Sequence, residues 1–94
     1  MIYLQCGIDV SDVTMEDIGN YFLSRGWDLG KRVNQMNVFI KYVGELPVEY
    51  MLPIHDNFAD NENRKEEALK FLMNTENLIN PYSLIEEIRR LRSY

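Results

Sequence analysis

The sequence contains little of the chemistry that disulfides and metal sites require. It has one cysteine, Cys6, and one histidine, His55. A single cysteine cannot form an intramolecular disulfide and excludes a metal site built from cysteines alone. Cys6 and His55 together would supply only two of the four ligands of a zinc site, so we expect Cys6 to be a small buried apolar side chain. No metal site and no cofactor are predicted.

The chain also lacks an apolar run approaching the roughly 20 residues of a membrane-spanning helix. Its first ten residues, MIYLQCGIDV, have no basic leader and are interrupted by polar residues, so they do not have the pattern of a signal peptide. The single cysteine suits a reducing compartment. The predicted location is therefore the cytoplasm, with no membrane partner.

Positive charge is scarce. Ten Lys and Arg residues stand against fifteen Asp and Glu, which gives a net charge of −5. This balance does not favour binding to phosphate backbones, which depends on Lys and Arg. The basic groupings are Lys31 with Arg32, and Arg89, Arg90 and Arg92 near the C-terminal end of a predicted helix, where cations are favoured by the helix dipole. Neither of the glycine-rich patterns that bind phosphate groups is present.

What the sequence does contain is typical of an ordinary folded domain. Its 94 residues are 46% apolar and 27% charged, and they predict a single domain over residues 1–94. The best-patterned stretch is 33–54, which predicts a hairpin with arms at about 36–43 and 48–54. Val38, Ile40 and Tyr42 alternate on one arm, as Val48, Tyr50 and Leu52 do on the other, so we expect these two sets to form one apolar face. Residues 2–6 alternate too and predict an additional strand, whereas residues 28–35 are interpreted as a polar connection with Gly30 at its centre.

Three helices complete the prediction, at about 15–25, 61–74 and 81–92. Thr14 and Asp17 form a variant of the capping box, and Gly26 is the kind of residue that ends a helix. The last helix begins with Asn80 as a cap and Pro81 at the first helical position. The predicted fold class is α+β, with a small antiparallel sheet packed by three helices.

This order of elements resembles small uncharacterised bacterial domains in which a helix ends in Gly-Trp, a hairpin ends in Leu-Pro, and an acidic loop leads into two helices. The residues that carry the resemblance are Leu23, Gly26, Trp27, Leu52, Pro53, Asp60, Arg64, Ala68 and Leu69, and it covers roughly residues 15–91. It implies no activity. The helix–Gly–Trp–hairpin order is also similar to the start of HicA-type messenger-RNA interferase toxins. Their catalytic Gly-Ser-His stretch is missing here, so that similarity implies no catalysis.

Two groups of polar residues are candidates for chemistry. His55 and Asp56 are the one neighbouring pair that resembles an acid–base couple, but adjacent side chains seldom point at one another and no nucleophile is matched to them. Asp56, Asp60 and Glu62 supply oxygen atoms of the kind that calcium and magnesium prefer, but not in the spacing of an EF-hand loop. Helix capping and a solvated loop explain these residues better. The sequence therefore predicts no catalytic residues and no enzyme.

The aromatic content of the chain indicates a binding surface. Six Tyr, four Phe and one Trp are many for so small a core, and Tyr and Trp are enriched at binding hot spots. On the hairpin's second face Phe39, Val43 and Met51 are apolar. If helices cover one face of the sheet, we expect these three to be exposed and to bind a partner; if both faces are covered, they belong to the core. The alternative binding surface is on the last predicted helix and consists of Arg89, Arg90 and Arg92.

Three hypotheses follow, in descending order. The first is a small acidic protein-interaction module, such as an inhibitor, an immunity or antitoxin-like protein, or an accessory subunit, whose partner is another protein or a further copy of the chain. The second is a nucleic-acid-binding module. The third is a small enzyme centred on His55 and Asp56.

Overall fold

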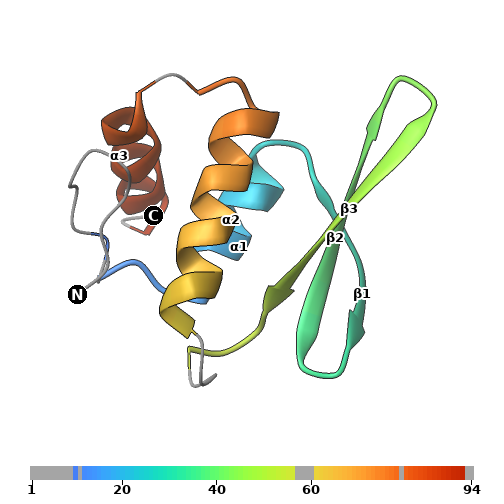
Figure 1. Cartoon of the computed structure of the whole chain (residues 1–94), viewed down its shortest axis with the longest axis horizontal. Helices are drawn as coiled ribbons and strands as arrows, with labels where there is room; N and C mark the ends of the chain where they lie inside the picture. Colours follow the sequence, from blue (N-terminus) through green and yellow to red (C-terminus); the bar gives the residue numbers. More distant parts are fainter. Residues whose placement is uncertain (1–9, 11, 57–60, 79, 93–94) are drawn as a thin grey trace.

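A computed structural model describes residues 10, 12–56, 61–78 and 80–92 of the chain. Their order is α1 (Met15–Ser24), β1 (Asp28–Val33), β2 (Met36–Val43), β3 (Leu46–Pro53), α2 (Asn61–Thr75) and α3 (Pro81–Arg92). The helices lie together on one side of a small antiparallel sheet (Figure 1). The predicted α+β class is confirmed. The strand predicted at residues 2–6 lies outside the described residues.

The sheet is a meander in which neighbouring strands in sequence are neighbours in space, in the order β1-β2-β3. The prediction that residues 28–35 form a polar connection is wrong, because residues 28–33 are the edge strand β1. A two-residue turn, Asn34–Gln35, joins β1 to β2, and both residues have positive φ angles of 51° and 63°. Such turns match the twist of a hairpin, but they usually contain glycine. This turn contains none, and so the sequence does not reveal it.

The predicted faces of the hairpin are shifted by one residue. Phe39 pairs with Tyr50 and Val38 pairs with Met51, and the register is continuous from Val43↔Leu46 to Met36↔Pro53. Directly opposed residues share a face. The set that contains Val38 therefore shares a face with Met51, and not with Tyr50 as expected. We call the face that contains Phe39, Tyr50 and Leu52 the inner face, and the opposite one the outer face.

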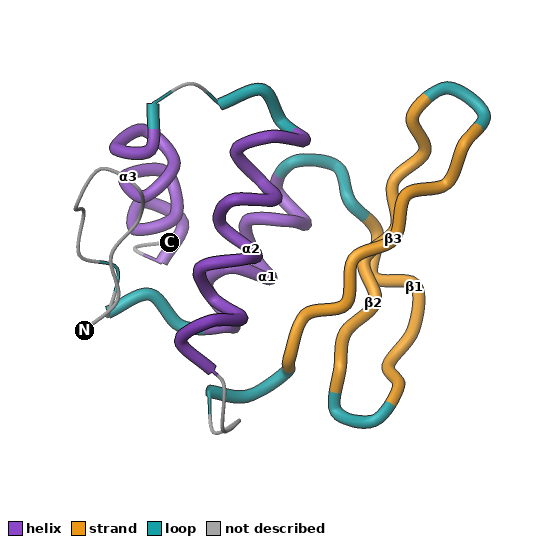
Figure 2. The backbone as a smooth tube through the Cα atoms, in the orientation of Figure 1, coloured by secondary structure: helices purple, strands orange, loops and turns teal. Residues whose placement is uncertain are grey.

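All three helices lie on the inner-face side of the sheet (Figures 1 and 2). The predicted capping box of α1 is confirmed: the Thr14 hydroxyl accepts from the Asp17 amide at 3.1 Å, and the Asp17 carboxylate accepts from the Thr14 amide at 3.0 Å. After the helix, Gly26 has a φ of 90°, the left-handed conformation that ends helices. Helix α1 lies at the centre of the fold and packs against α2, α3 and the sheet.

The core joins the inner face of the sheet to the three helices. Its buried members are Val10, Val13, Met15, Ile18, Tyr21, Phe22, Trp27, Phe39, Leu52, Ala68, Leu69, Leu72, Leu84, Ile85 and Ile88. The helical spacing of Leu84, Ile85, Ile88 and Leu91 predicts one apolar stripe on α3; the first three are buried, and Leu91 is half-buried and packs against the core. None of the described helices combines the length and the apolar content needed to cross a membrane.

Aromatic rings fill the contact between the helices and the sheet. The Phe22 ring stacks on Phe39 with centroids 4.8 Å apart and meets Trp27 edge-on at 5.3 Å. Phe71 of α2 stacks on Tyr50 at 4.4 Å. Trp27 itself is fully buried. Much of the aromatic surplus therefore serves the core, and only part of it remains for a binding surface.

A cluster of side chains around Glu76, which we call the Glu76 cluster, holds the end of α2 against the sheet. The Glu76 carboxylate, whose side chain is only 7% exposed, accepts a hydrogen bond from Trp27 Nε1 at 2.8 Å and from Lys41 Nζ at 2.9 Å. Arg25 approaches the same carboxylate at 3.6 Å. Burial alone would raise the pKa of Glu76, but the hydrogen bonds from Lys41 and Trp27 outweigh it and lower the pKa. Glu76 is therefore held as a carboxylate.

Candidate functional site

The outer face of the sheet is the part of the described structure that most resembles a binding surface. Its side chains follow from the strand register and the alternation of strands. They are Asp28, Lys31 and Val33 on β1; Met36, Val38, Ile40 and Tyr42 on β2; and Pro47, Glu49, Met51 and Pro53 on β3. The three described helices lie on the other side of the sheet (Figure 1), and from α2 the Arg64 guanidinium reaches Sδ of Met36 at one end of this face, at 3.9 Å.

The outer face is apolar along its centre. Tyr42 is 68% exposed and Met51 is 51% exposed, while Ile40 is half-buried. Val38 is only 2% exposed, yet it is not a member of the core that the helices close. In the register Val38 lies between Lys31 and Met51, so its neighbours on the sheet cover it. An apolar column along β2 is thus bordered by charged residues on the two edge strands.

A bulge in β1 shapes this face. The pairing of β1 with β2 shifts between Leu29 and Lys31, which leaves Gly30 as the extra residue. A Cβ atom built on Gly30 would lie 2.4 Å from Cδ1 of Ile40. Gly30 therefore leaves the space into which the Ile40 side chain extends, and the apolar column reaches across onto β1.

The turn between β2 and β3 adds a second exposed apolar group. Val43 and Leu46 form the last pair of the hairpin, and Leu46 is 73% exposed. Figure 1 shows this tip projecting away from the helices. Most exposed large apolar side chains of the described structure belong to the sheet. They are Leu29, Val33, Tyr42, Val43, Leu46 and Met51 on the sheet, and Leu23 and Tyr82 on the helices.

The two edges of the sheet are less suited to binding than its face. Strand β3 contains Pro47 and Pro53, which have no amide hydrogen to donate. Strand β1 contains Lys31, Arg32 and the bulge, which are features that natural proteins use to prevent strand addition. A partner would therefore contact side chains of the face, and not the backbone of an edge.

The predicted binding residues on the hairpin do not form one patch. Phe39 is 2% exposed and lies in the core on the inner face, so its predicted exposure is wrong. Val43 lies at the tip on the same side as Phe39, whereas Met51 lies on the outer face. Of these three, only Met51 contributes to the outer face. The sequence pattern predicts Ile40 and Tyr42 on the core-facing side of the hairpin, whereas in the structure they lie with Met51 on the outer face.

The predicted basic surface of α3 is used within the fold. Arg92 contacts the Asp17 carboxylate at 2.6 Å and donates to the Asp12 carbonyl oxygen at 3.0 Å. Arg89 forms an ion pair with Asp12 at 2.9 Å, and its hydrogen bonds lower the pKa of Asp12. Arg90 pairs with Glu86 at 3.2 Å. Arg89 and Arg92 therefore fasten α3 to the start of α1 and to the residues that precede it, whereas the Arg90 pair lies within α3.

His55 and Asp56 do not form an acid–base couple. One Asp56 oxygen accepts the Met15 amide at 3.0 Å, at the start of α1, and lies 3.3 Å from the buried Lys65 ammonium group. His55 lines a groove of about 350 Å³ between α1 and the inner face. Within the described residues, no three histidine, cysteine, aspartate or glutamate side chains gather to hold a metal ion. Asp60 and Cys6 lie outside the described residues.

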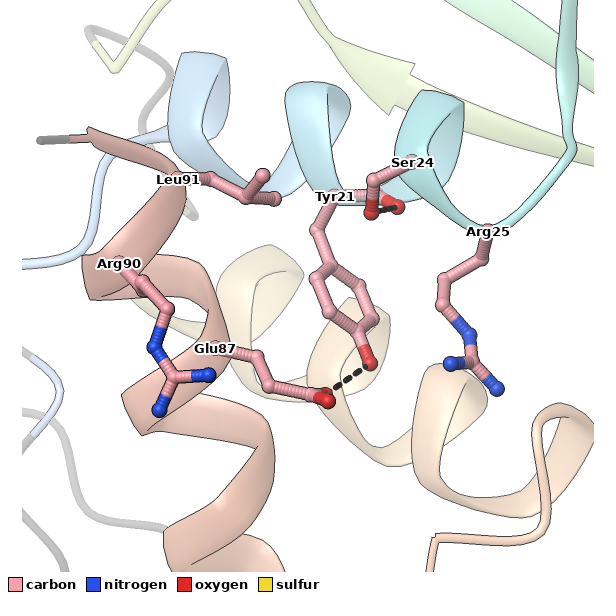
Figure 3. Close-up of a pocket in the computed structure, with 6 residues that line it drawn as sticks. All are labelled: Tyr21, Ser24, Arg25, Glu87, Arg90 and Leu91. Atoms are coloured by element: carbon pink, nitrogen blue, oxygen red, sulfur yellow. Dashed lines mark hydrogen bonds between the residues drawn. The ribbon is translucent and has the colours of Figure 1, made fainter. Parts of the chain in front are cut away.

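A second cleft, of about 250 Å³, lies between α1 and α3 (Figure 3). Its central contact is a 2.7 Å hydrogen bond from the Tyr21 hydroxyl to Glu87. Burial and this carboxylate raise the pKa of Tyr21. The Ser24 hydroxyl donates to the Tyr21 carbonyl oxygen at 2.7 Å. Because both hydroxyl groups donate within the fold, we interpret the cleft as part of the α1–α3 contact.

Comparison of the chain with models of protein families, with curated proteins and with solved structures found no match. The resemblance to bacterial α+β domains stays a prediction. The functional assignment therefore depends on the geometry of the outer face.

Proposed function

We propose that this chain is a protein-interaction module that binds another protein through the outer face of its sheet. The main evidence is the contrast between the inner and outer faces of the sheet. The inner face is packed by aromatic and aliphatic side chains, whereas Tyr42 and Met51 on the outer face are more than half exposed. Contiguous exposed apolar surface on a small protein commonly marks a contact with another protein.

The electrostatics support this proposal over nucleic-acid binding. A nucleic-acid surface would need several cations available to phosphate groups. Arg89 and Arg92 instead contact Asp12 and Asp17 within the fold, and the net charge is −5. The engagement of Asp56 by the start of α1 supports a module without catalytic activity. We place the module in the cytoplasm, a proposal that the single cysteine supports.

The experiment is an affinity capture with matched variants. Tyr42→Glu and Met51→Glu place a charge on the outer face. Tyr82→Glu places one on α3, at an aromatic residue whose exposed fraction, 61%, lies between those of Tyr42 and Met51. Proteins retained by the wild type and by Tyr82→Glu, but lost with both face variants, are the expected result. Circular dichroism verifies that each variant is folded. A specific partner that both face variants retain would contradict the assignment of the surface.

A further inference from the structure

We propose that the groove between α1 and the inner side of β1, which we call the α1–β1 groove, binds a free α-amino acid with an aliphatic side chain, such as leucine. The site lies on the opposite side of the sheet from the outer face, so the proposal goes beyond the proposed function. The volume of the groove, about 350 Å³, falls within the range of about 300–1,000 Å³ that is common for small-molecule sites.

The groove exists because the helices leave β1 uncovered. Every residue of β1 is exposed, whereas β2 and β3 supply Phe39 and Leu52 to the core. Leu29 pairs with Phe39 and Arg32 pairs with Asn37, so both of these β1 side chains lie on the inner face. They form one wall of the groove.

The other wall is one side of α1. Glu16, Asn20 and Leu23 line the groove and are four and three residues apart, so they follow one another along the helix. Gly19 has no side chain, and a Cβ atom there would lie 3.4 Å from Cζ of Phe39. The Phe39 ring is therefore part of the floor of the groove.

Two hydrogen bonds determine which ends of the two walls meet. The Asp56 carboxylate accepts from the Met15 amide at 3.0 Å, at the start of α1. The Ile54 amide, two residues earlier, donates to the Gln35 carbonyl oxygen at 3.0 Å, in the turn that follows β1. The start of α1 therefore lies near the end of β1, and the end of α1 lies near the start of β1.

The groove is consequently charged at one end and apolar at the other. Glu16 and Arg32 lie at the charged end, one on each wall. Leu23 and Leu29 lie at the apolar end, and they are 48% and 41% exposed. A ligand that matches both ends carries charges of both signs and an apolar side chain.

The two charged side chains are available to such a ligand. Both are exposed, and neither forms an ion pair with another residue that the structure describes. Arg32 Nε donates to Asn37 Oδ1 at 3.0 Å, which orients the guanidinium group and leaves its two terminal nitrogens for a carboxylate. Glu16 can accept from an ammonium group. A fatty acid would leave Glu16 without a partner and a simple amine would leave Arg32 without one, whereas an amino acid satisfies both.

Titration of the isotope-labelled full chain with L-leucine, followed in its amide NMR spectrum, tests the proposal. The Gly19 and Arg32 amides should shift and saturate with a dissociation constant of roughly 0.1–1 mM, because so small a ligand in an open groove makes few contacts. Glycine lacks the aliphatic side chain and should bind about tenfold more weakly. The absence of a saturable shift up to about 20 mM L-leucine would overturn the proposal.

Two variants and two ligand derivatives test the assigned contacts. Arg32→Gln and Glu16→Gln should each raise the dissociation constant for L-leucine about three- to tenfold. Lys70→Gln and Glu66→Gln make the same changes of charge on the exposed side of α2 and should leave it unchanged. The amide spectrum of each variant verifies that it is folded.

The derivatives separate the two charges of the ligand. N-acetyl-L-leucine has no ammonium group, so Glu16→Gln should not weaken its binding further. L-leucine amide has no carboxylate, so Arg32→Gln should not weaken its binding further. Losses of the same size in the two α2 variants would overturn the groove as the site. Derivatives that remain sensitive to both groove variants would overturn the assigned contacts.

Discussion

Replacing Glu76 with alanine should destabilise the fold well beyond the effect of an ordinary surface charge. The substitution leaves the Trp27 indole N–H without its acceptor in a buried position, which costs about 1–3 kcal/mol. Lys41 also loses its carboxylate partner. Its side chain is 29% exposed, so water compensates in part and we add only about 1 kcal/mol. The expected loss is about 2–4 kcal/mol, a large part of the stability of a small domain.

Urea denaturation followed by the fluorescence of Trp27, the single tryptophan, measures this loss. Glu76→Gln keeps an acceptor for the indole and removes only the charge, so it should cost about half as much. Glu66→Gln is the matched control, because Glu66 pairs with Lys70 on the exposed side of α2 and should cost less than about 0.5 kcal/mol. A loss below about 1 kcal/mol in Glu76→Ala would refute the reasoning. Equal losses in the alanine and glutamine variants would show that the indole hydrogen bond contributes nothing.

The Glu76 cluster also predicts how the stability of the fold depends on acid pH. The pKa of Glu76 in the folded state lies below its ordinary value of 4.5. Its contribution to stability is therefore fully present above the unfolded pKa and is lost as the pH falls through the folded pKa. Between neutral pH and about pH 3 the wild type should lose more free energy of unfolding than Glu76→Gln does. Parallel curves for the two proteins would contradict this expectation.

Three further substitutions test individual parts of the fold. Gly19→Ala should raise the free energy of unfolding by about 0.5–1 kcal/mol, because alanine favours the helix over glycine. The added Cβ atom would lie 3.4 Å from Cζ of Phe39, which is an ordinary contact distance. Gln35→Gly should also stabilise, by about 1 kcal/mol, because it removes a side chain from a position with a φ of 63°; a lower midpoint would argue against the turn. Asp56→Ala should cost roughly 1–2 kcal/mol, since it removes the partner of the buried Lys65, while His55→Ala should leave the midpoint unchanged. Equal effects of these last two would disprove the assigned role of Asp56.

Helices α1 and α3 could be predicted from the sequence because residues at their ends satisfy the backbone groups that a helix leaves unpaired. Thr14 with Asp17, Gly26, and Asn80 with Pro81 each satisfy or avoid unpaired backbone groups at a helix end. Strand β1 could not be predicted, because every residue of it is exposed and its polar sequence has no alternation of period two. An exposed edge strand that is held mainly by backbone hydrogen bonds leaves no such pattern.

The site was placed on the wrong side of the sheet for a related reason. The predicted apolar face, which has Tyr42 and Val48 on the same side, requires a register that pairs Tyr42 with Val48, but the observed two-residue turn pairs Tyr42 with Pro47. A change of one residue in register moves every side chain of one strand to the other face. That is why Phe39, an expected binding residue, lies in the core. Charge partners such as Arg92 and Asp17, which are far apart in sequence, also need the fold to be known.

The way α3 is held has a consequence for partial unfolding. This helix packs chiefly on α1, and charged groups that are partly exposed to water, Arg89 and Arg92 with Asp12 and Asp17, fasten it there. Salt weakens such pairs, and acid removes the carboxylate charges. Release of α3 alone would uncover Leu84 and Ile88 while the sheet with α1 and α2 stays assembled. The amides of α3 should therefore exchange with deuterium earlier than those of α1, and the difference should widen as salt is added or the pH is lowered.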